Sequence, residues 1–432
     1  MRRVLRALGP GILFAGAAIG VSHLVQATRA GAEFGLALLL LVLLAHAMKL
    51  PAMLFGPRYA AATRTSLLQG YRNQGVHALG VFALITVGTA FTIQAAVTIV
   101  TASIVRFVLV EPLVGPGTPL WVISAGLLAL CAGLIAVGGF GWLDKALKIL
   151  MAVMAVSTLI AAGLEAPELR SESLVLLPRI PGDAASRAAM LAFCVALVGW
   201  MPAPLDISVW HSLWTLARER QTRHAPTRRE CEIDFGVGYA LCVLLAVCFV
   251  VLGAGMLHGT GVEPAASSDG FANQLIDLYA ASIGPWVRPL IAACAVAVMF
   301  STTLTVLDAL PRSVVITAAR FRRDEARADT TLPTRDLCRT RGYWAALVVI
   351  AAGALLIIGR VQGQGFRLLI DLATTLSFLG TPLLAWFNHR AILAAEVGEA
   401  HRPGKAMIAW SRLGIAFWTL FAGLFLWNWM QG

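Results

Sequence analysis

Apolar residues run in long stretches along this chain, and short polar segments separate them. Runs long enough to cross ~30 Å of hydrocarbon as helices recur down to the C-terminus. There are eleven, centred near residues 18, 44, 94, 129, 154, 200, 246, 298, 350, 378 and 418. The pattern predicts an all-α integral membrane protein whose partner is the lipid bilayer, with residues 1–432 forming one transmembrane domain.

Composition supports this interpretation. Of 432 residues, 58% are hydrophobic and 13% are charged, whereas about 25% of a soluble domain is charged. A water-soluble fold and a disordered chain are both excluded. The longest polar stretches, at 216–233 and 320–341, are short Arg-rich connectors without a core of their own. Any function must therefore lie within the membrane.

The net charge of +11 would suggest nucleic acid as a partner of a soluble protein. In a membrane protein it records loop orientation instead, so we expect no nucleic-acid partner. If the N-terminus lies inside, most of the 34 Lys and Arg residues also lie inside, Lys49 among them, and the acidic stretches 165–183 and 263–277 lie outside. We therefore expect a cytoplasmic N-terminus, an outer C-terminus and a place in the bacterial inner membrane.

Two residue types have ordinary interpretations. The seven cysteines form no C-x-x-C pair and lie mostly in apolar runs, so they are expected to be reduced packing residues. Five tryptophans are predicted to lie at the headgroup level as interface residues: Trp386, Trp410, Trp418, Trp427 and Trp429.

The first and sixth runs contain helix breakers. The first, at 9–28, has four glycines followed by Ser22, His23 and Gln26. The sixth, at 194–214, has Pro202 and Pro204, followed by Asp206. Each proline removes a backbone donor and clashes with the preceding turn, so two together predict an unwound segment beside protein or a water-filled cavity.

The spacing of the two breaks indicates an inverted repeat. Two interrupted helices five crossings apart have opposite orientations, and in such repeats they meet at the midplane and hold the substrate. We predict one repeat at about 8–163, a second at about 188–388 and an additional, peripheral helix at about 408–428.

Ionisable residues at membrane depth are candidates for function because an uncompensated charge there costs at least ~2.5–3.5 kcal/mol. Asp206 either caps the resumed half-helix or acts as a cation-binding or proton-carrying carboxylate. His23 either binds a metal or proton or is a satisfied core residue. Met201 offers a thioether ligand, or fills a gap in the core.

Four further polar residues are weaker candidates for a proton path or a supporting role. His211 lies nearer the inner end of the sixth run, where it suits an exit path or packing. Asp308 and Asp371 are buried-acid candidates whose alternative role is an interhelical hydrogen bond. Gln94 in the third run is weaker still.

Residues 9–35 resemble the first helix of the Nramp (natural resistance-associated macrophage protein) transporters. In that family a Gly-Pro start precedes a D-P-G-N break and a closing A-G-A-x-aromatic-G, which here is Ala30 to Gly35. GWLDKALK (141–148) and the pair His211-Ser212 resemble the fifth and sixth helices. The resemblance implies a LeuT-like inverted-repeat fold with an inward N-terminus. It also implies proton-coupled uptake of divalent metal ions such as manganese and iron.

The motifs that bind metal in the family are altered here. In an ungapped overlay, D-P-G-N falls on Gly20-Val21-Ser22-His23, so the acid and amide that are ligands in the family become Gly20 and His23. The M-P-H motif of the sixth helix corresponds to Met201-Pro202-Ala203, or, aligned on His211, to Pro204-Leu205-Asp206. The third-helix acids of the family's proton path have no counterpart at 91–105.

Our leading hypothesis is an Nramp-related secondary transporter that carries a divalent cation, of the Mn/Fe type or Mg, by alternating access. Asp206 would restore the missing charge, and a larger site of Ser22, His23 and Asp206 would suit partly hydrated magnesium. The metal would be substrate rather than cofactor, and protons are the candidate coupling ion.

The alternative within transporters is a LeuT-fold carrier of a small organic or amino-acid-like solute. The tryptophans around the sixth-run break, Trp200, Trp210 and Trp214, favour it because such rings suit stacking on an organic substrate. An enzyme is not expected, because no H-E-x-x-H or Ser/His/Asp arrangement stands at a recognised spacing.

Overall fold

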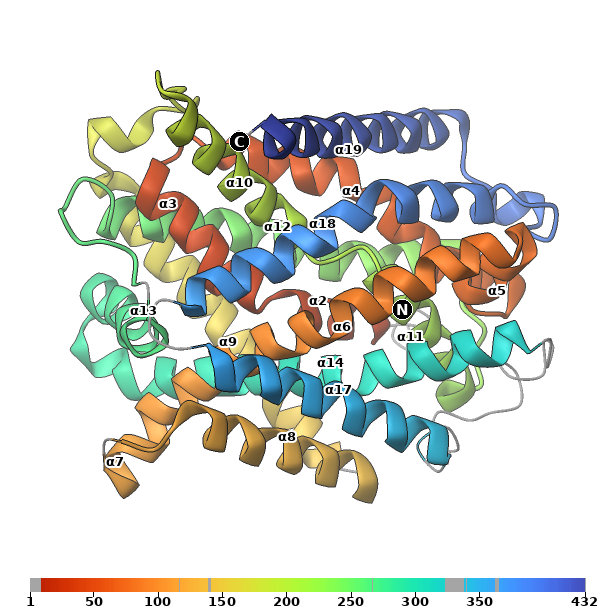
Figure 1. The fold of residues 1–432 in the computed structure, drawn as a ribbon, viewed down its shortest axis with the longest axis horizontal. Coiled ribbons are helices and arrows are strands. Elements are labelled where there is room, and N and C mark those ends of the chain that lie inside the picture. The colour runs from red at the N-terminus through yellow and green to blue at the C-terminus, as the bar shows by residue number, and fades with distance from the viewer. Residues whose placement is uncertain are drawn as a thin grey trace.

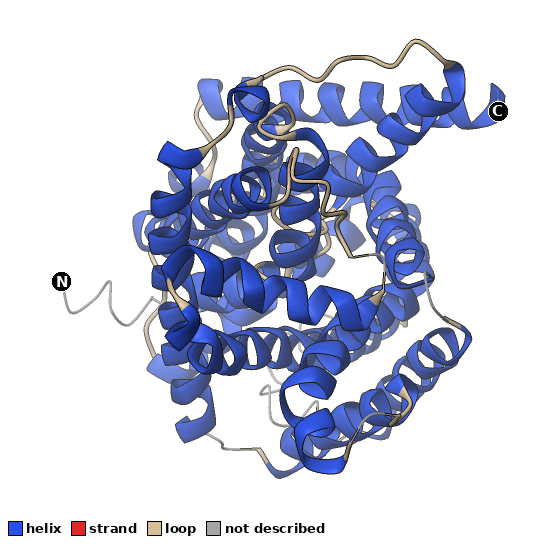
Figure 2. Ribbon diagram, turned by 90° about the vertical axis from the view of Figure 1, so that its left-hand side faces the viewer, coloured by secondary structure: helices blue, strands red, loops and turns tan. Residues whose placement is uncertain are grey.

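A computed structural model describes residues 9–115, 117–138, 141–265, 267–322, 338, 340–361 and 365–431. Within these ranges every regular element is a helix (Figure 2), which confirms the all-α prediction. The seven cysteines are free, as expected.

Nine of the predicted runs form continuous helices that are long and apolar enough to cross a membrane, counted over the described residues. Several include short extensions, such as the continuation of α6 to Val114. The nine are α4 (Leu39–Thr63), α6 (Val76–Val105), α8 (Leu120–Val137), α9 (Gly141–Glu165), α12 (Arg228–Met256), α14 (Arg288–Phe321), α17 (Arg341–Arg360), α18 (Gly365–Ile392) and α19 (Lys405–Gln431).

The first and sixth runs are the interrupted ones. The first consists of α2 (Pro10–Ala18) and, after a bend of 48°, the π-helical η1 (Ser22–Ala27) continued by α3 (Thr28–Phe34). The sixth consists of α10 (Ala184–Gly199) and α11 (Ile207–Thr222), separated by the segment that holds both prolines. With the bent first run, the described residues hold up to ten crossings that are long and apolar enough, and the sixth run adds the shorter apolar helix α10, which is roughly consistent with the eleven predicted crossings.

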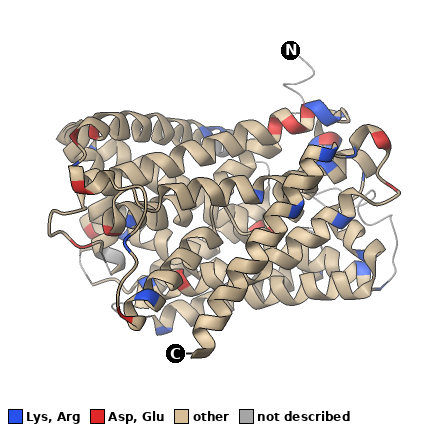
Figure 3. Ribbon diagram, turned by 90° about the horizontal axis from the view of Figure 1, so that it is seen from above, with Lys and Arg blue, Asp and Glu red and all other residues tan. Residues whose placement is uncertain are grey.

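The bundle is elongated along its helices, with α19 at one edge and α8 at the opposite edge (Figure 1). The short helices α5 (Leu67–Gln74) and α13 (Ser268–Ile283) lie at opposite ends. Charged residues lie mostly toward the two ends of the bundle (Figure 3). A long apolar middle with charged ends is what a bilayer requires.

Helix pairing follows the predicted inverted repeat. The second half of the first crossing, α3, packs along the seventh crossing, α12. In the same way, the second half of the sixth crossing, α11, packs along the second crossing, α4. The inverted repeat relates the first crossing to the sixth and the second crossing to the seventh. It therefore relates the α3–α12 pair to the α11–α4 pair, as observed.

Glycines allow the closest of these contacts. A Cβ on Gly31 of α3 would lie 2.0 Å from the Val250 carbonyl oxygen of α12, and one on Gly253 would lie 2.1 Å from the Thr28 oxygen. Only residues without a side chain let two helix backbones approach this closely. The first crossing is therefore fitted tightly to α12.

Two placements expected from the sequence are wrong. Lys49 was expected at the inner end of the second run, but α4 continues to Thr63 and leaves Lys49 fully buried in mid-helix. Trp418 was expected at the headgroup level, but it is 1% exposed and packs edge-on against Phe378 of α18. The peripheral eleventh helix thus sends a ring into the bundle.

Candidate functional site

The two helix breaks meet in the interior of the bundle. The Ser22 hydroxyl, which can donate only one proton, lies 2.8 Å from the Ala18 carbonyl oxygen of its own break and 3.2 Å from the Pro202 oxygen of the other break. Carbonyl oxygens without a helical hydrogen bond, which are expected at an interrupted helix, are therefore present. Neighbouring side chains lie within hydrogen-bond distance of some of them. Ser22, Pro202 and Pro204, all predicted from sequence, come together here.

A small cavity of about 20 Å³ lies between the breaks. Its wall includes Ser22, Ala203, Trp200 and Trp210 from the two broken crossings, and Thr302 from α14. The volume suits one water or one bare ion. The indole N–H groups of both tryptophans are buried without a hydrogen-bond partner.

The first-helix positions give the site no anion. Gly20 faces Thr302, and a Cβ there would lie 3.1 Å from both Cγ2 and Oγ1 of that residue. His23 is fully buried, and its two ring nitrogens lie 3.2 Å from the Ala18 carbonyl and 3.0 Å from the Cys242 carbonyl. The imidazole therefore connects the first break to α12.

The carbonyls of the sixth break are occupied by a lysine that the sequence analysis placed elsewhere. Lys49 Nζ donates to the carbonyl oxygens of Val198 at 2.8 Å, Gly199 at 2.7 Å and Ala203 at 3.2 Å. The Trp418 ring lies under the same nitrogen, 5.4 Å from centroid to Nζ. The end of a helix carries partial negative charge, which favours a cation at this position.

Asp206 is the acid of the site. It is 3% exposed, and neither carboxylate oxygen has a hydrogen-bond partner. Although Asp206 stands at the N-cap position of α11, its side chain accepts no capping bond, so the capping role considered from sequence is not realised. Its charge interacts with Lys49 through space. Met201, two residues before Ala203, is completely buried.

An ionic cluster closes the bundle on one side of the breaks. Arg29 of α3 donates to Asp371 of α18 at 2.7 Å, and Gln26 donates to the same oxygen at 2.9 Å. Glu33 accepts from Arg367 at 3.1 Å and lies 3.5 Å from Arg29. We name Arg29, Glu33, Arg367 and Asp371 the outer cluster. Asp371, a candidate from sequence, thus joins the first and tenth crossings.

A second closure lies on the other side of the breaks. Asp234 of α12 accepts from the backbone N–H of Gly9 at 2.8 Å and of Gly11 at 2.7 Å, at the start of α2. His211 Nε2 lies 3.8 Å from the same carboxylate, and its ring stacks on Phe14 at 5.6 Å. We name this contact the inner cap. A carboxylate at a helix N-terminus satisfies free N–H groups and the helix dipole together.

Two sequence candidates lie apart from this arrangement. Asp308 of α14 accepts from Arg312 and from Tyr343 of α17, each at 2.7 Å, so it fills the interhelical hydrogen-bonding role considered as its alternative. Gln94 donates to Thr98 of its own helix at 3.0 Å, and its carbonyl oxygen is buried without a partner. Its neighbour Ile93 lines the small cavity.

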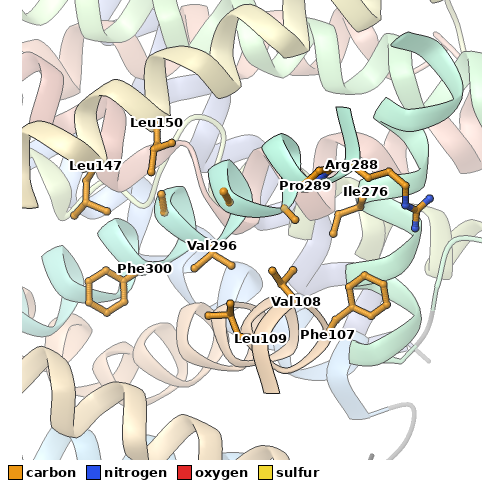
Figure 4. A pocket seen from close by; sticks show the side chains of 13 residues that line it. Phe107, Val108, Leu109, Leu147, Leu150, Ile276, Arg288, Pro289, Val296 and Phe300 are labelled. Atoms are coloured by element: carbon orange, nitrogen blue, oxygen red, sulfur yellow. The ribbon is translucent and has the colours of Figure 1, made fainter. Parts of the chain in front are cut away.

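The large apolar cavity of about 700 Å³ in Figure 4 is a different feature. Phe107, Val108 and Leu109 line one side of it, and Val296 and Phe300 of α14 the other. Among the described residues that line it, Arg288 is the charged one, and it pairs with Asp277. Such a lining gives a small ion no ligands, so the candidate site is the small cavity between the breaks.

The sequence analysis missed the residues that complete the site and its closures: Arg29, Lys49, Asp234, Thr302 and Trp418. A lysine within an apolar run was the one available signal for Lys49. Among the described residues, no group of three or more His, Cys, Asp and Glu side chains could hold a metal ion. Any cation would therefore depend on carbonyl and hydroxyl oxygens as well as Asp206.

Two interrupted helices that meet between two closures define a membrane-embedded carrier of the inverted-repeat type. Residues 11–428 match the family described as natural resistance-associated macrophage protein-like. The chain therefore belongs to the Nramp family, as the sequence resemblance implied, and is an integral membrane protein. Membership in a family of transporters also supports the expectation that it is not an enzyme.

A protein of Pasteurella multocida (strain Pm70), described as uncharacterized, is 31% identical over 425 residues. The match covers 97% of this chain and 92% of the relative.

Solved structures share the fold. A manganese transporter of Eremococcus coleocola, in complex with an aromatic bis-isothiourea substituted compound, has a TM-score of 0.63 at 13% identity, covering 98% of this chain and 86% of that chain. MhsT in complex with L-phenylalanine has a TM-score of 0.59 at 13% identity, covering 97% and 98%. These similarities confirm the LeuT-like architecture.

Proposed function

We propose that this protein is a secondary transporter that moves a divalent cation through the junction of its two interrupted helices. One observation carries the proposal. A buried carboxylate without a hydrogen-bond partner, Asp206, stands at the break between Pro204 and Ile207, two residues that line the ion-sized cavity. An unpaired buried acid is costly and marks a place where a cation or proton binds.

Oxygen ligands favour a hard cation. The break offers the carbonyls of Pro202 and Ala203, the hydroxyl of Ser22 and the carboxylate of Asp206. Both ring nitrogens of His23 are already within hydrogen-bond distance of the protein, Nδ1 of the Ser22 hydroxyl at 2.8 Å and Nε2 of the Cys242 carbonyl at 3.0 Å. Oxygen donors suit magnesium and manganese better than softer ions. We therefore infer that Mg²⁺ or Mn²⁺ is the substrate, and that Asp206 takes the role of the family's first-helix acid, whose position in this chain is Gly20, packed against Thr302.

The two closures support transport by alternating access. The outer cluster joins α3 to α18, and the inner cap joins α2 to α12, so both sides of the break are closed in this conformation. Opening of one closure at a time would expose the site to one side of the membrane. The cation would enter by separation of Arg29 from Asp371 and leave by release of α2 from Asp234.

Proteoliposomes that contain a fluorescent Mg²⁺ or Mn²⁺ indicator test the proposal. Uptake is expected for the wild type and for Asp183→Asn, an exposed acid that caps α10. For Asp206→Asn it should fall by at least about tenfold, because the lost charge is worth more than 1.4 kcal/mol at a buried site. An inactive wild type, or an Asp206→Asn variant as fast as wild type, would refute the assignment.

We further propose protons as the coupling ion and the bacterial inner membrane, with a cytoplasmic N-terminus, as the location. The concentration of basic residues on one side supports the orientation. A pH gradient imposed on the same liposomes should then change the rate of uptake. Cation uptake that acidifies no lumen and ignores the gradient would exclude proton coupling.

A small organic solute is the second candidate, and the indole N–H groups of Trp200 and Trp210 favour it, since they lack acceptors and their rings line the cavity. A solute with a carboxylate or carbonyl would accept from them. The cavity is too small for such a solute until the bundle opens. Thermal stabilisation by an organic compound without any divalent cation would support this candidate.

A further inference from the structure

The environment of Lys49 has the composition of a cation site. Three carbonyl oxygens from the sixth break surround Nζ within 3.2 Å, and an aromatic face lies below it. Carbonyl oxygens and an aromatic face are the groups that bind ammonium ions in proteins. We name Val198, Gly199, Ala203 and Trp418 the ammonium cage.

Three accepting carbonyls match the three protons of an ammonium group and exceed the two of a neutral amine. The fully buried side chain has no route to solvent in this conformation. The negative counter-charge comes from Asp206, which interacts with Lys49 through space rather than in a close ion pair. The geometry of the cage therefore suits an ammonium group better than a neutral amine.

The cage also overlaps the transport site. Ala203 accepts from Lys49 through its carbonyl and is also one of the residues that line the small cavity. A divalent cation at the junction would need the same carbonyl oxygens and the charge of Asp206. It would also meet the positive charge of Lys49 at close range, where repulsion in a low dielectric is strong.

We propose that Lys49 is a tethered cation that occupies the sixth-helix carbonyls when the carrier is empty, and that Lys49 and the transported cation exclude one another. This inference rests on the proposed function for its second half. The empty carrier can then close both sides with its carbonyls satisfied, since the ammonium group donates hydrogen bonds to the oxygens that the departing cation no longer coordinates. The eleventh helix contributes Trp418 to this arrangement.

The first test concerns the cage alone and needs no substrate. Lys49→Ala removes the tethered ammonium group and leaves room for a free one. Methylammonium at about 100 mM should raise the Tm of this variant by about 2 °C or more, because a ligand that binds only the folded state stabilises it. Lys49→Met fills the cage with apolar atoms and should show no such rise. A methylammonium response equal to that of the wild type would overturn the proposal.

The second test concerns exclusion. Lys49→Met should bind Mn²⁺ with a Kd at least about tenfold lower than the wild type in calorimetry, because the ion no longer competes with an ammonium group for the carbonyls. Lys405→Met, which removes an exposed lysine at the start of α19, is the matched control and should bind as the wild type does. Equal affinities for all three proteins would overturn the exclusion.

The ammonium cage and the proposed cation transport can be refuted separately. Stabilisation of Lys49→Ala by methylammonium, with no divalent cation bound to the wild type or to Lys49→Met, supports the cage and refutes the proposed function. If Lys49→Ala cannot be purified folded, Trp418→Leu keeps the lysine and removes the ring. This variant should bind Mn²⁺ more tightly than the wild type, and unchanged or weaker binding would count against the proposal.

Discussion

Arg29 and Asp371 hold the first and tenth crossings together through a 2.7 Å contact between guanidinium Nη1 and carboxylate Oδ1. The Arg29 side chain is 9% exposed and the Asp371 side chain 30%, so solvent screens the pair only in part. The face of Phe193 of α10 covers the same guanidinium at 4.8 Å. Three crossings are thus joined at Arg29.

Asp371→Asn is expected to open the outer side. Without the carboxylate charge, α3 and α18 separate more often, and Thr28, which is 7% exposed beside Arg29, becomes reachable. A Thr28→Cys reporter should react with a membrane-impermeant maleimide about tenfold faster in this background. Asp277→Asn, which breaks the Arg288 pair on α14 instead, should leave the labelling rate unchanged. Equal rates in both backgrounds would show that the pair does not act as a closure.

Asp234→Asn is expected to loosen the inner cap. An amide keeps one acceptor oxygen and loses the charge that faces the start of α2, where Gly9 and Gly11 donate. Hydrogen exchange of the amides at 9–13 should accelerate by about tenfold, since hydrogen bonds to a charged acceptor contribute about 1.5–3 kcal/mol. Asp183→Asn removes a comparable cap from α10 and should leave these amides protected. Unchanged exchange in Asp234→Asn would contradict the inner closure.

Gly31→Ala is expected to destabilise the protein. The added Cβ would meet the Val250 carbonyl of α12 at 2.0 Å, so the two backbones must move apart. Overpacking of this kind costs about 1–3 kcal/mol, and Tm in detergent should fall. Gly126→Ala in α8, where nothing lies within 4 Å of the new Cβ, should be neutral or slightly stabilising because alanine favours the helix. Similar Tm values for both variants would indicate that α3 is not fitted tightly to α12.

Much of the architecture could be predicted from the sequence because it depends on local physics. Run lengths set the crossings, and the paired prolines at 202 and 204 set the sixth break. The first break was also visible, because glycines and polar residues crowd into one apolar run. These features need no knowledge of which helices touch.

The contacts that complete the site could not be predicted in this way. Lys49 stands near the end of an apolar run, and the sequence analysis took the end of that run as the end of the helix. The helix in fact continues to Thr63. Its carbonyl partners lie on a helix about 150 residues away. Asp234 likewise appears in the sequence as an acid at the edge of a loop, and only the fold brings the start of α2 to it. Candidates chosen by depth alone therefore included Asp308, which holds two other helices together.

Asp308 and Asp206 should behave as opposites when each is changed to asparagine. Asp308 accepts from Arg312 and Tyr343, so Asp308→Asn removes a negative charge beside a largely buried guanidinium and should cost about 1–3 kcal/mol of stability. The affinity for the transported cation should not change, because this contact lies between α14 and α17. Asp206→Asn relieves the burial of a carboxylate that has no hydrogen-bond partner but also removes the counter-charge of Lys49, so Tm should change less than in Asp308→Asn while cation binding is lost. Thermal unfolding and calorimetric titration with Mn²⁺ on the same samples measure both quantities, and weaker binding in Asp308→Asn at unchanged Tm would return that residue to the transport path.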